Sequence, residues 1–265
     1  MSFLTISEAT MNDLFDLLRR IGLRLSREAF EALLTHAQKN RLSPAQIFEQ
    51  LCEIEQRERD ARNLARRTRA ATLGPCKPLD KFDWNHPRSV DRALYEQLLT
   101  LDFLARGENV LFRGQAGVGK TTLAQNIGLR ALERGHTVRF STLPAALADL
   151  LRQESLPATE RRLRRYTSPD LLILDELGYV PCDSRAADLL FHIISRRHEK
   201  RAVVLTTNLA YKAWGSVFHD ASCLGALVDR FAQHCHHLDI DAESWRHKEA
   251  QQRSRGKKTS SRDES

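Results

Sequence analysis

Residues 110–123 combine the residue types that binding a phosphate requires. An apolar run leads into a glycine-rich segment, which is followed by Lys120, Thr121 and Thr122 and then by a helical pattern. The spacing fits the phosphate-loop pattern G-x-x-x-x-G-K-[ST], which here begins at Gly114 and ends at Thr121. Glycines let backbone amides approach an anion closely, and the start of the following helix adds its positive dipole end.

This loop predicts a site for ATP and Mg²⁺. Lys120 supplies a compact positive charge for the β- and γ-phosphates, and the hydroxyl of Thr121 is a hard oxygen ligand that suits Mg²⁺. The simplest alternative is a glycine-rich turn, but the strand pattern before the loop and the helical pattern after it disfavour that reading. The residues that we expect to bind ATP here are Gly114, Gln115, Ala116, Gly117, Val118, Gly119, Lys120, Thr121 and Thr122.

Two acids follow a second apolar run, in the segment LLILDEL at residues 171–177. In a phosphate-loop ATPase, an aspartate at this place helps to hold Mg²⁺, and a glutamate directly after it polarises the attacking water as a general base. Paired acids at the end of a strand are also common on surfaces, so this interpretation depends on the phosphate loop. We predict Thr121 and Asp175 as Mg²⁺ ligands, and Lys120 and Glu176 as catalytic residues.

A third apolar run ends in polar residues, in the segment VVLTTN at residues 203–208. If this strand lies beside the strand of the phosphate loop, Asn208 reaches the γ-phosphate or the attacking water. The alternative is that Asn208 caps the helix that follows. We predict Asn208 as a further catalytic residue.

Strands and helices alternate from residue 109 onward, which is the pattern of an α/β domain. Such a pattern predicts a parallel sheet flanked by helices, with the ligand at the carboxyl ends of the strands. A single helix is expected before the sheet, over residues 90–105. The expected strands are residues 110–113, 137–141, 171–175, 202–207 and, more weakly, 237–240.

The remaining segments predict a small helical domain, a linker and a tail. Ser26 and Ser43 are good caps for two helices, and Ser7 or Thr10 is a cap for an earlier one. Prolines break the helical pattern before the α/β domain, where Phe82 and Trp84 either anchor the linker or stack on a base. The predicted segments are a helical domain at 1–72, a linker at 73–88, an ATPase domain at 89–246 and a basic disordered tail at 247–265.

Composition narrows the class of protein. The chain has 265 residues, a formal net charge of +7 and a pI of about 9.4, a balance that suits an acidic polymer such as nucleic acid. Its five cysteines form no C-x-x-C pair, which is typical of reduced thiols in a cytosol. No run is long and apolar enough for a membrane-spanning helix or a signal peptide. We therefore expect a soluble cytoplasmic protein with no membrane partner.

These segments together resemble the IstB-type transposition ATPases, close relatives of DnaC-type helicase loaders within the AAA+ superfamily. The resembling segments are LDFLARGENVLFRGQAGVGKTTLA, PDLLILDELGYVP, VVLTTNLAYKAWGSVFHD, LVDRF and ESWR, in this order. Their order is much more specific than the phosphate loop alone. The fold that the resemblance implies is an AAA+ P-loop NTPase, a parallel sheet flanked by helices, with a small all-α N-terminal domain.

The resemblance also implies further site residues. Asn208 matches the sensor-1 position, and Arg246 matches the sensor-2 arginine, which contacts ATP. Arg230, in LVDRF, matches a catalytic arginine that reaches the nucleotide of a neighbouring subunit, where its charged fork stabilises the transferred phosphoryl group. Without the resemblance, Asp229 and Arg230 are equally well interpreted as a surface ion pair.

The biological role that the resemblance implies is an ATP-dependent homo-oligomer on DNA, which assists a partner transposase in target selection and transposition. A helicase loader for replication is the alternative. A small-molecule kinase is disfavoured by Asp175, Glu176 and Asn208, since a kinase needs an acceptor site and a lid instead. A nucleotide-regulated binding module with little turnover stays open, and it predicts that Glu176→Gln leaves function intact.

Two basic runs are candidate DNA-binding surfaces. Arginines along a helix neutralise phosphates and release counterions, which gives salt-dependent binding with little sequence preference. The alternative is a solvated helix face, which charge runs usually are. The net positive charge and the resemblance favour DNA for both. The runs are Arg57, Arg59, Arg62, Arg66, Arg67 and Arg69, and Arg161, Arg162, Arg164 and Arg165.

Residues 234–237 read HCHH and contain atoms that can bind a metal. Adjacent side chains at the start of a strand point in alternating directions, so the four make a poor tetrahedral site. We predict no metal at this segment.

Overall fold

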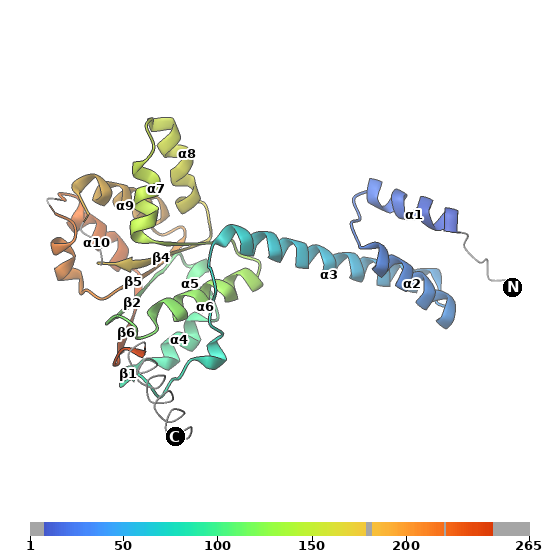
Figure 1. Ribbon diagram of the computed structural model, residues 1–265, viewed down its shortest axis with the longest axis horizontal. Coiled ribbons are helices and arrows are strands. Elements are labelled where there is room, and N and C mark those ends of the chain that lie inside the picture. The colour runs from blue at the N-terminus through green and yellow to red at the C-terminus, as the bar shows by residue number, and fades with distance from the viewer. Residues whose placement is uncertain (1–7, 179–181, 220, 246–265) are drawn as a thin grey trace, which may run out of the picture. The chain divides into compact units, whose positions relative to one another are not determined.

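The chain folds into two compact units, Met1–Arg66 and Arg67–Ser265. Helix α3 (Pro44–Ala71) begins in the first unit and ends in the second, and the predicted boundary at residue 72 lies just after this helix. Among the described residues, no helix is both long and apolar enough to cross a bilayer. The structure is a computed structural model that describes residues 8–178, 182–219 and 221–245 (Figure 1).

The first unit is built from α1 (Glu8–Arg20), α2 (Arg27–Asn40) and the first part of α3. The predicted cap Ser26 accepts a hydrogen bond from the amide of Ala29, and Ser43 starts α3 in the same way. A predicted cap at Ser7 lies outside the described residues, and α1 begins at Glu8. The core of the unit consists of Phe15, Leu18, Leu25, Phe30, Leu33 and Leu51.

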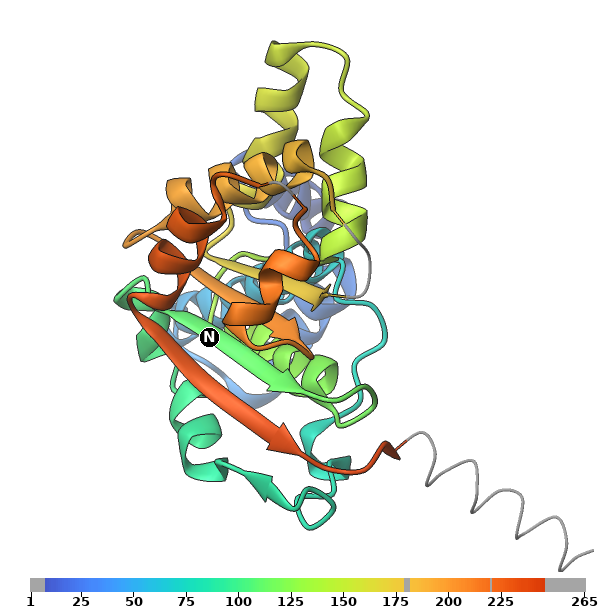
Figure 2. The ribbon, with the colours of Figure 1, turned by 90° about the vertical axis from the view of Figure 1, so that its left-hand side faces the viewer.

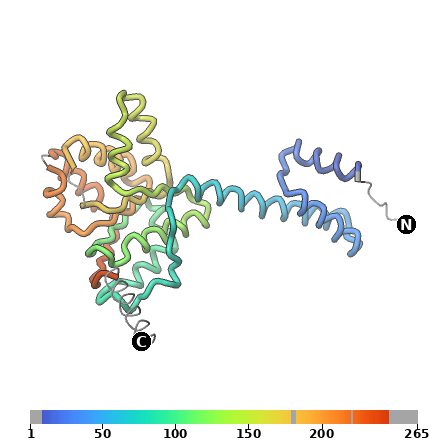
Figure 3. Tube along the Cα trace, in the orientation of Figure 1, coloured from blue at the N-terminus to red at the C-terminus, as the bar shows by residue number. Residues whose placement is uncertain are grey.

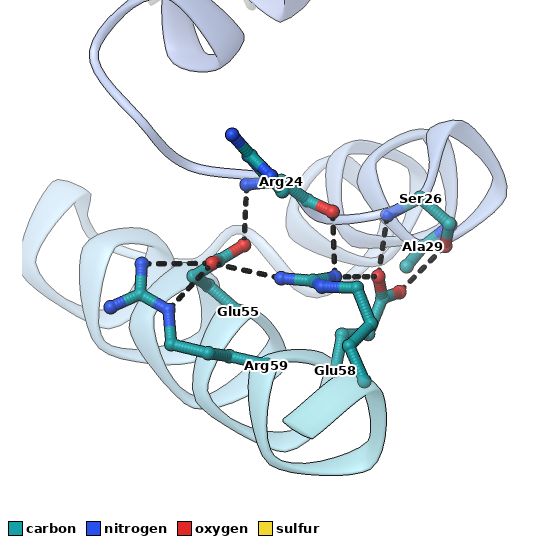
Figure 4. Close-up of polar contacts among 7 residues, drawn as sticks. Arg24, Ser26, Ala29, Glu55, Glu58 and Arg59 are labelled. Atoms are coloured by element: carbon teal, nitrogen blue, oxygen red, sulfur yellow. Dashed lines mark hydrogen bonds and ion pairs between the residues drawn. The ribbon is translucent and has the colours of Figure 1, made fainter. Parts of the chain in front are cut away.

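Two acids of α3 fasten the segment between α1 and α2 (Figure 4). Glu55, which is only 4% exposed, accepts a hydrogen bond of 2.7 Å from the amide of Arg24. Glu58 accepts hydrogen bonds from the amide and the hydroxyl of Ser26, at 2.7 and 2.6 Å. These acids therefore satisfy backbone donors ahead of α2 that have no partner within the helix.

The second unit contains a six-stranded sheet with the order β1-β6-β2-β5-β4-β3. All neighbouring strands pair in parallel except β1, which is antiparallel to β6. Figure 2 shows β6 running beside β2 in the same direction. The strands are β1 (Ser89–Val90), β2 (Asn109–Gly114), β3 (Val138–Thr142), β4 (Leu171–Leu177), β5 (Ala202–Thr207) and β6 (Cys235–Asp241).

Apolar side chains alternate between the two faces of this sheet. Leu172 and Leu174 belong to a core shared with α7 (Leu143–Leu151) and α9 (Ser184–Arg197). Ile173 points to the other face, where its side chain approaches Gly128 of α6. Because both faces are covered, the first four residues of β4 and of β5 are all apolar, as in strands of a buried parallel sheet.

Helices complete a layer on each face of the sheet, as Figure 3 traces. On one side lie α7, α8 (Leu156–Thr167), α9 and α10 (Leu224–Ala232). On the other side lies α6 (Lys120–Glu133), where the hydroxyl of Tyr95 donates to the carbonyl of Leu123. The predicted α/β fold with a parallel sheet flanked by helices is confirmed.

The predicted helix over residues 90–105 is wrong, because the structure has two helices there, α4 (Arg92–Leu98) and α5 (Asp102–Ala105). Leu101, which directly precedes α5, has φ +71°, a left-handed conformation that redirects the chain between the two helices. The short strand β1 was not predicted, since two residues carry no periodic pattern. Two 3₁₀ helices, η1 (Leu79–Lys81) and η2 (Tyr211–Ser216), complete the unit.

A buried arginine ties α9 to the starts of two strands. Arg197 is 1% exposed, and burial lowers the pKa of its guanidinium to about 9. Its partners are carbonyl oxygens rather than a carboxylate, so backbone dipoles stabilise the charge. It therefore fixes the registers of β4 and β5, whose opposite ends carry the predicted catalytic residues. The carbonyls belong to Tyr166, Thr167, Pro169, Asp170 and Ala202.

Candidate nucleotide-binding site

The predicted phosphate loop connects β2 to α6 at the carboxyl edge of the sheet. Gly119, which caps α6, has φ +99°, a conformation that favours glycine. A Cβ at Gly119 would also lie 2.6 Å from the ring of Phe82. At Gly114, a Cβ would lie 2.4 Å from the carbonyl oxygen of Ile240, so this glycine is required by packing against the segment of β6.

Lys120 is the first residue of α6, and it is 6% exposed. Its Nζ donates hydrogen bonds of 2.7 Å to the carbonyl oxygens of Gly114 and Gln115. These bonds hold the ammonium group inside the curve of the loop. A buried ammonium group at the start of a helix is a strong attraction for an anionic group.

Asp175 lies opposite the loop, at the carboxyl edge of β4. It is 3% exposed, and the hydroxyl of Thr121 lies 3.0 and 2.9 Å from its two carboxylate oxygens. The hydroxyl of Thr206, on β5, also donates to this carboxylate. The structure therefore brings the neighbouring residues Lys120 and Thr121 together with Asp175, which comes from a distant part of the sequence.

Glu176 follows Asp175 at an irregularity of the sheet. The pairing of β4 with β5 shifts register between Leu174 and Leu177, and Glu176 has φ +65°. Few residues other than glycine adopt this left-handed conformation, and such residues gather at functional sites. The result is that Glu176 is exposed and lines the cavity, while both flanking residues are buried.

Asn208 directly follows β5, at the same edge of the sheet. Its side-chain oxygen would lie 2.9 Å from a Cβ placed on Gly178, the residue after β4. Thr207 shapes this turn, because its hydroxyl donates to the carbonyl of Leu177 at 2.8 Å and accepts from the amide of Leu209 at 3.0 Å. Asn208 thus stands beside the exit of β4, and its catalytic role stays a prediction.

A cavity of about 370 Å³ is lined by Lys120, Thr121, Asp175 and Glu176, whereas Asn208 is not among its lining residues. One wall is the phosphate loop from Ala116 to Thr122, and the acids Asp175 and Glu176 line the same space. The other wall comes from the predicted linker and from the segment after β6. The residues of that wall are Pro75, Lys77, Pro78, Lys81, Phe82, Asp83, His86 and Trp245.

The segment after β6 is fastened to the phosphate loop and to the linker. The amide of Trp245 donates to the carbonyl of Gly117 at 3.0 Å. His86 lies 2.8 Å from the carbonyl oxygen of Glu243, and its ring meets the ring of Trp245 edge to face. Phe82 contacts the loop at Gly119, whereas Trp84 packs on Tyr95. Of the two linker aromatics, only Phe82 lines the cavity.

The oxygen atoms in the cavity suit Mg²⁺ chemically. Thr121 and Asp175 offer a hydroxyl and a carboxylate, which are hard donors of the kind that Mg²⁺ prefers beside phosphates. The two groups already lie within hydrogen-bonding distance of each other. The donor set therefore fits the predicted metal, which stays a prediction.

Arg230 lies on α10, away from the residues that line the cavity of its own chain. Its guanidinium donates to the hydroxyl of Ser195 and stacks 4.8 Å from the ring centre of Phe191. A role of Arg230 at a nucleotide therefore requires the site of a second copy. Arg246, the other predicted arginine, lies outside the described residues.

The two basic runs contain arginines in different situations. Arg59 and Arg62 contact Glu55 at 2.9 and 3.2 Å, and Arg67 donates to the carbonyl of Leu132. In the second run, on α8, Arg162 lies 3.1 Å from Asp149. Binding of DNA by either run stays a prediction. The exposed side chains are Arg57, Arg59, Arg62, Arg66, Arg69, Arg161, Arg164 and Arg165.

The histidine-rich segment divides between the two faces of β6. His236 lies 2.8 Å from Glu108 on one face, while His237 lies 2.9 Å from the hydroxyl of Tyr211 on the other. Burial raises the pKa of the Cys235 thiol to about 12, which opposes the thiolate that a metal needs. These contacts hold the segment to its neighbours.

Sequence reasoning missed the contributions of Thr206, His86 and Trp245. Thr206 stands two residues before the predicted Asn208, and its place near Asp175 follows from the pairing of β4 with β5. His86 and Trp245 carried no such signal, because the linker and the segment after β6 come together only in the folded chain, where β1 pairs antiparallel with β6.

Residues 16–253 match the family described as IstB-like ATP binding protein. Among curated relatives, the chain is 35% identical to an ATP-binding protein of insertion sequence IS21 from Pseudomonas aeruginosa, over 90% of each chain. It is 34% identical to an ATP-binding protein of insertion sequence IS5376 from Geobacillus stearothermophilus, over 87% of this chain and 92% of the relative.

Solved structures support the fold. One neighbour is DnaI, with a TM-score of 0.51 and 18% identity over 65% of this chain and 90% of that chain. Another is the replication initiator DnaA bound to AMPPCP and single-stranded DNA, with a TM-score of 0.53 and 22% identity over 65% of this chain and 52% of that chain. The shared fold is that of AAA+ P-loop ATPases.

Proposed function

The chain belongs to the IstB-like ATP-binding protein family, and from this premise we propose that it is a Mg²⁺-dependent ATPase that assembles on DNA and assists a transposase. The observation that carries the proposal is the convergence of Lys120, Thr121, Asp175 and Glu176 on one cavity. These side chains supply a cation, a hydroxyl and two carboxylates, which is the set that hydrolysis of a nucleoside triphosphate requires.

In the proposed reaction, the loop amides and Lys120 bind the β- and γ-phosphates, while Thr121 and Asp175 hold Mg²⁺. The metal supplies charge neutralisation on the phosphate oxygens. Glu176 accepts a proton from the attacking water, since its carboxylate lines the cavity and is exposed. Phe82 and Trp245 give the far side of the cavity an apolar surface that suits the base of the nucleotide.

A second copy completes the proposed site. Arg230 lies outside its own cavity, so a neighbouring subunit has to deliver this arginine to the γ-phosphate. Catalysis then depends on assembly, because a lone subunit lacks the charge that stabilises the transferred phosphoryl group. This dependence is the physical reason for coupling ATP hydrolysis to an oligomer on DNA.

The partners follow from the relatives, whose names place them in insertion sequences. We propose DNA as a largely sequence-independent ligand and the transposase of the same element as the protein partner. The net positive charge of the chain attracts the phosphates of DNA, which supports DNA as a ligand.

Electron microscopy of the full chain with DNA tests the proposal. Ordered assemblies are expected with ATP or a non-hydrolysable analogue, and they should be absent with DNA alone or nucleotide alone. Strand transfer by the transposase of the same element, measured with and without this chain, then tests the proposed role in transposition. No change in transfer frequency or target choice would contradict the transposition role, and a stimulated loading of replicative helicase would favour a helicase loader.

A further inference from the structure

The hydroxyl of Thr206 joins the two predicted catalytic acids. It donates a hydrogen bond to the carboxylate of Asp175 and accepts one from the amide of Glu176 at 3.1 Å. Thr206 lies on β5 and is 1% exposed, so its side chain has no freedom to leave this position. One hydroxyl from a neighbouring strand therefore contacts a side chain and a backbone group of two consecutive residues.

The contact falls where the sheet is irregular. The ladder between β4 and β5 shifts register between Leu174 and Leu177, and Glu176 adopts φ +65° within this shift. A residue other than glycine holds such a conformation only when its surroundings enforce it. At this irregularity the amide of Glu176 donates to the Thr206 hydroxyl, and this bond supplies part of that enforcement.

The carboxylate of Asp175 is held from two elements. Thr121 contacts it from α6 and Thr206 contacts it from β5. A carboxylate fixed by two hydroxyls on different elements has little rotational freedom, so its oxygens keep one direction toward the phosphate loop.

We propose that Thr206 is a positioning residue, which holds Asp175 toward the phosphate loop and Glu176 toward the cavity. This inference rests on the proposed ATPase function. The simpler alternative is that the hydroxyl only satisfies buried polar groups. In that case its removal costs stability and leaves the chemistry of the folded protein unchanged.

The chain offers a matched control at the other end of the sheet. The hydroxyl of Thr137 donates to the carboxylate of Asp170 at 2.8 Å and accepts from the amide of Asp170 at 3.0 Å. Thr137 makes the same two kinds of bond as Thr206, but it lies ahead of β3 and is exposed. Thr137→Val therefore removes equivalent bonds outside the cavity.

The test compares Thr206→Val, Thr206→Ser and Thr137→Val in the full chain with DNA. We expect Thr206→Val to lower kcat about 100-fold, because misplacing catalytic groups by roughly 1 Å costs that much. Thr206→Ser should recover kcat to within about 3-fold of wild type, since it restores the hydroxyl, and Thr137→Val should leave kcat unchanged to within about 2-fold.

Nucleotide affinity gives a second readout that does not depend on turnover. With a non-hydrolysable ATP analogue, Thr206→Val should bind as wild type does in EDTA, but it should lose most of the gain in affinity that Mg²⁺ gives. The inference would be overturned if Thr206→Val had the kcat of the wild type and also the same gain in analogue affinity on addition of Mg²⁺. Equal losses of kcat and of melting temperature in Thr206→Val and Thr137→Val would overturn it as well, because they would indicate stability alone.

The outcomes separate this inference from the proposed function. If the wild-type chain hydrolyses no ATP with DNA, the proposed function fails, and the magnesium gain alone then decides whether Thr206 positions Asp175. If the wild type hydrolyses ATP and Thr206→Val equals it in both readouts, only the role of Thr206 fails.

Discussion

Two buried carboxylates, Asp175 at the end of β4 and Glu55 on α3, are held by different kinds of partner. Hydroxyl groups of Thr121 and Thr206 contact Asp175, which lines a cavity. Guanidinium groups contact Glu55, which also accepts a hydrogen bond from the backbone amide of Arg24, between α1 and α2. A hydroxyl is a hard oxygen ligand that can itself coordinate a metal, whereas a guanidinium neutralises the charge of the carboxylate.

This difference separates a site for a ligand from a structural cluster. The acid at the nucleotide cavity is positioned to act on what enters the cavity. Glu55 on α3 instead forms ion pairs with Arg59 and Arg62. These two arginines are therefore weaker candidates for DNA binding than Arg57 or Arg69. The net charge of a helix is therefore a weak guide to its ligands. Whether each arginine is paired with an acid of the same helix is more informative.

The largest expected effect concerns the acid beside Asp175. Glu176→Gln should lower kcat about 1,000-fold, because the amide cannot accept a proton from the attacking water. Affinity for ATP should stay within about 3-fold of wild type, and assemblies on DNA should persist instead of dissociating. Single-turnover hydrolysis and filter binding measure the two effects. Unchanged turnover would remove Glu176 from its role, whereas lost turnover with intact function on DNA would favour a nucleotide-regulated binding module.

The next effect tests whether the cavity needs a second copy. Arg230→Ala should lower kcat about 100-fold and spare ATP binding, since one charge that stabilises the transition state is lost. Mixing this variant with Glu176→Gln should restore part of the hydrolysis, because some interfaces then combine a wild-type Glu176 with a wild-type Arg230. Normal hydrolysis by Arg230→Ala alone would refute a role of Arg230 at the nucleotide.

How far the sequence predicted this molecule depends on how local each signal is. Lys120, Thr121 and Asp175 were predictable because strands of a parallel sheet deliver their carboxyl ends to one edge. The partners of Arg59 and Arg62 were present in the sequence, as glutamates four residues earlier at Glu55 and Glu58. The turn at Leu101 and the contact of Trp245 with the phosphate loop had no comparable signal, since both depend on tertiary packing.

The cluster on α3 provides a test of stability. Glu55→Ala should lower the free energy of unfolding of the helical unit by about 2 kcal/mol, because a buried amide and two guanidinium groups lose their acceptor. Its exposed neighbour Glu53 offers a matched control, and Glu53→Ala should stay within about 0.5 kcal/mol of wild type. Urea unfolding of the full chain, monitored by circular dichroism, measures both. Equal stability of the two variants would show that the contacts of Glu55 do not stabilise the helical unit.

The smallest expected effect distinguishes the two kinds of arginine. Replacing Arg164 and Arg165 on α8 by glutamine should weaken DNA binding about 10-fold at moderate salt and reduce the salt slope by about 2, because two phosphate contacts are lost. The same replacement of Arg59 and Arg62 should change the affinity for DNA less than about 2-fold, since Glu55 already forms ion pairs with both arginines and Glu58 with Arg62. Fluorescence anisotropy with labelled duplex DNA at several salt concentrations measures both pairs. Equal losses would show that the partners on α3 do not matter for DNA.

Calorimetric titration of a non-hydrolysable ATP analogue into the full chain, with and without Mg²⁺, tests the central claim most directly. The wild type should bind about one analogue per chain, more tightly with Mg²⁺, and Lys120→Ala should bind roughly 100-fold more weakly because the charge for the phosphates is gone. No heat from the wild type, or the same affinity for Lys120→Ala as for the wild type, would contradict a shared site for triphosphate and magnesium between α6, β4 and β5.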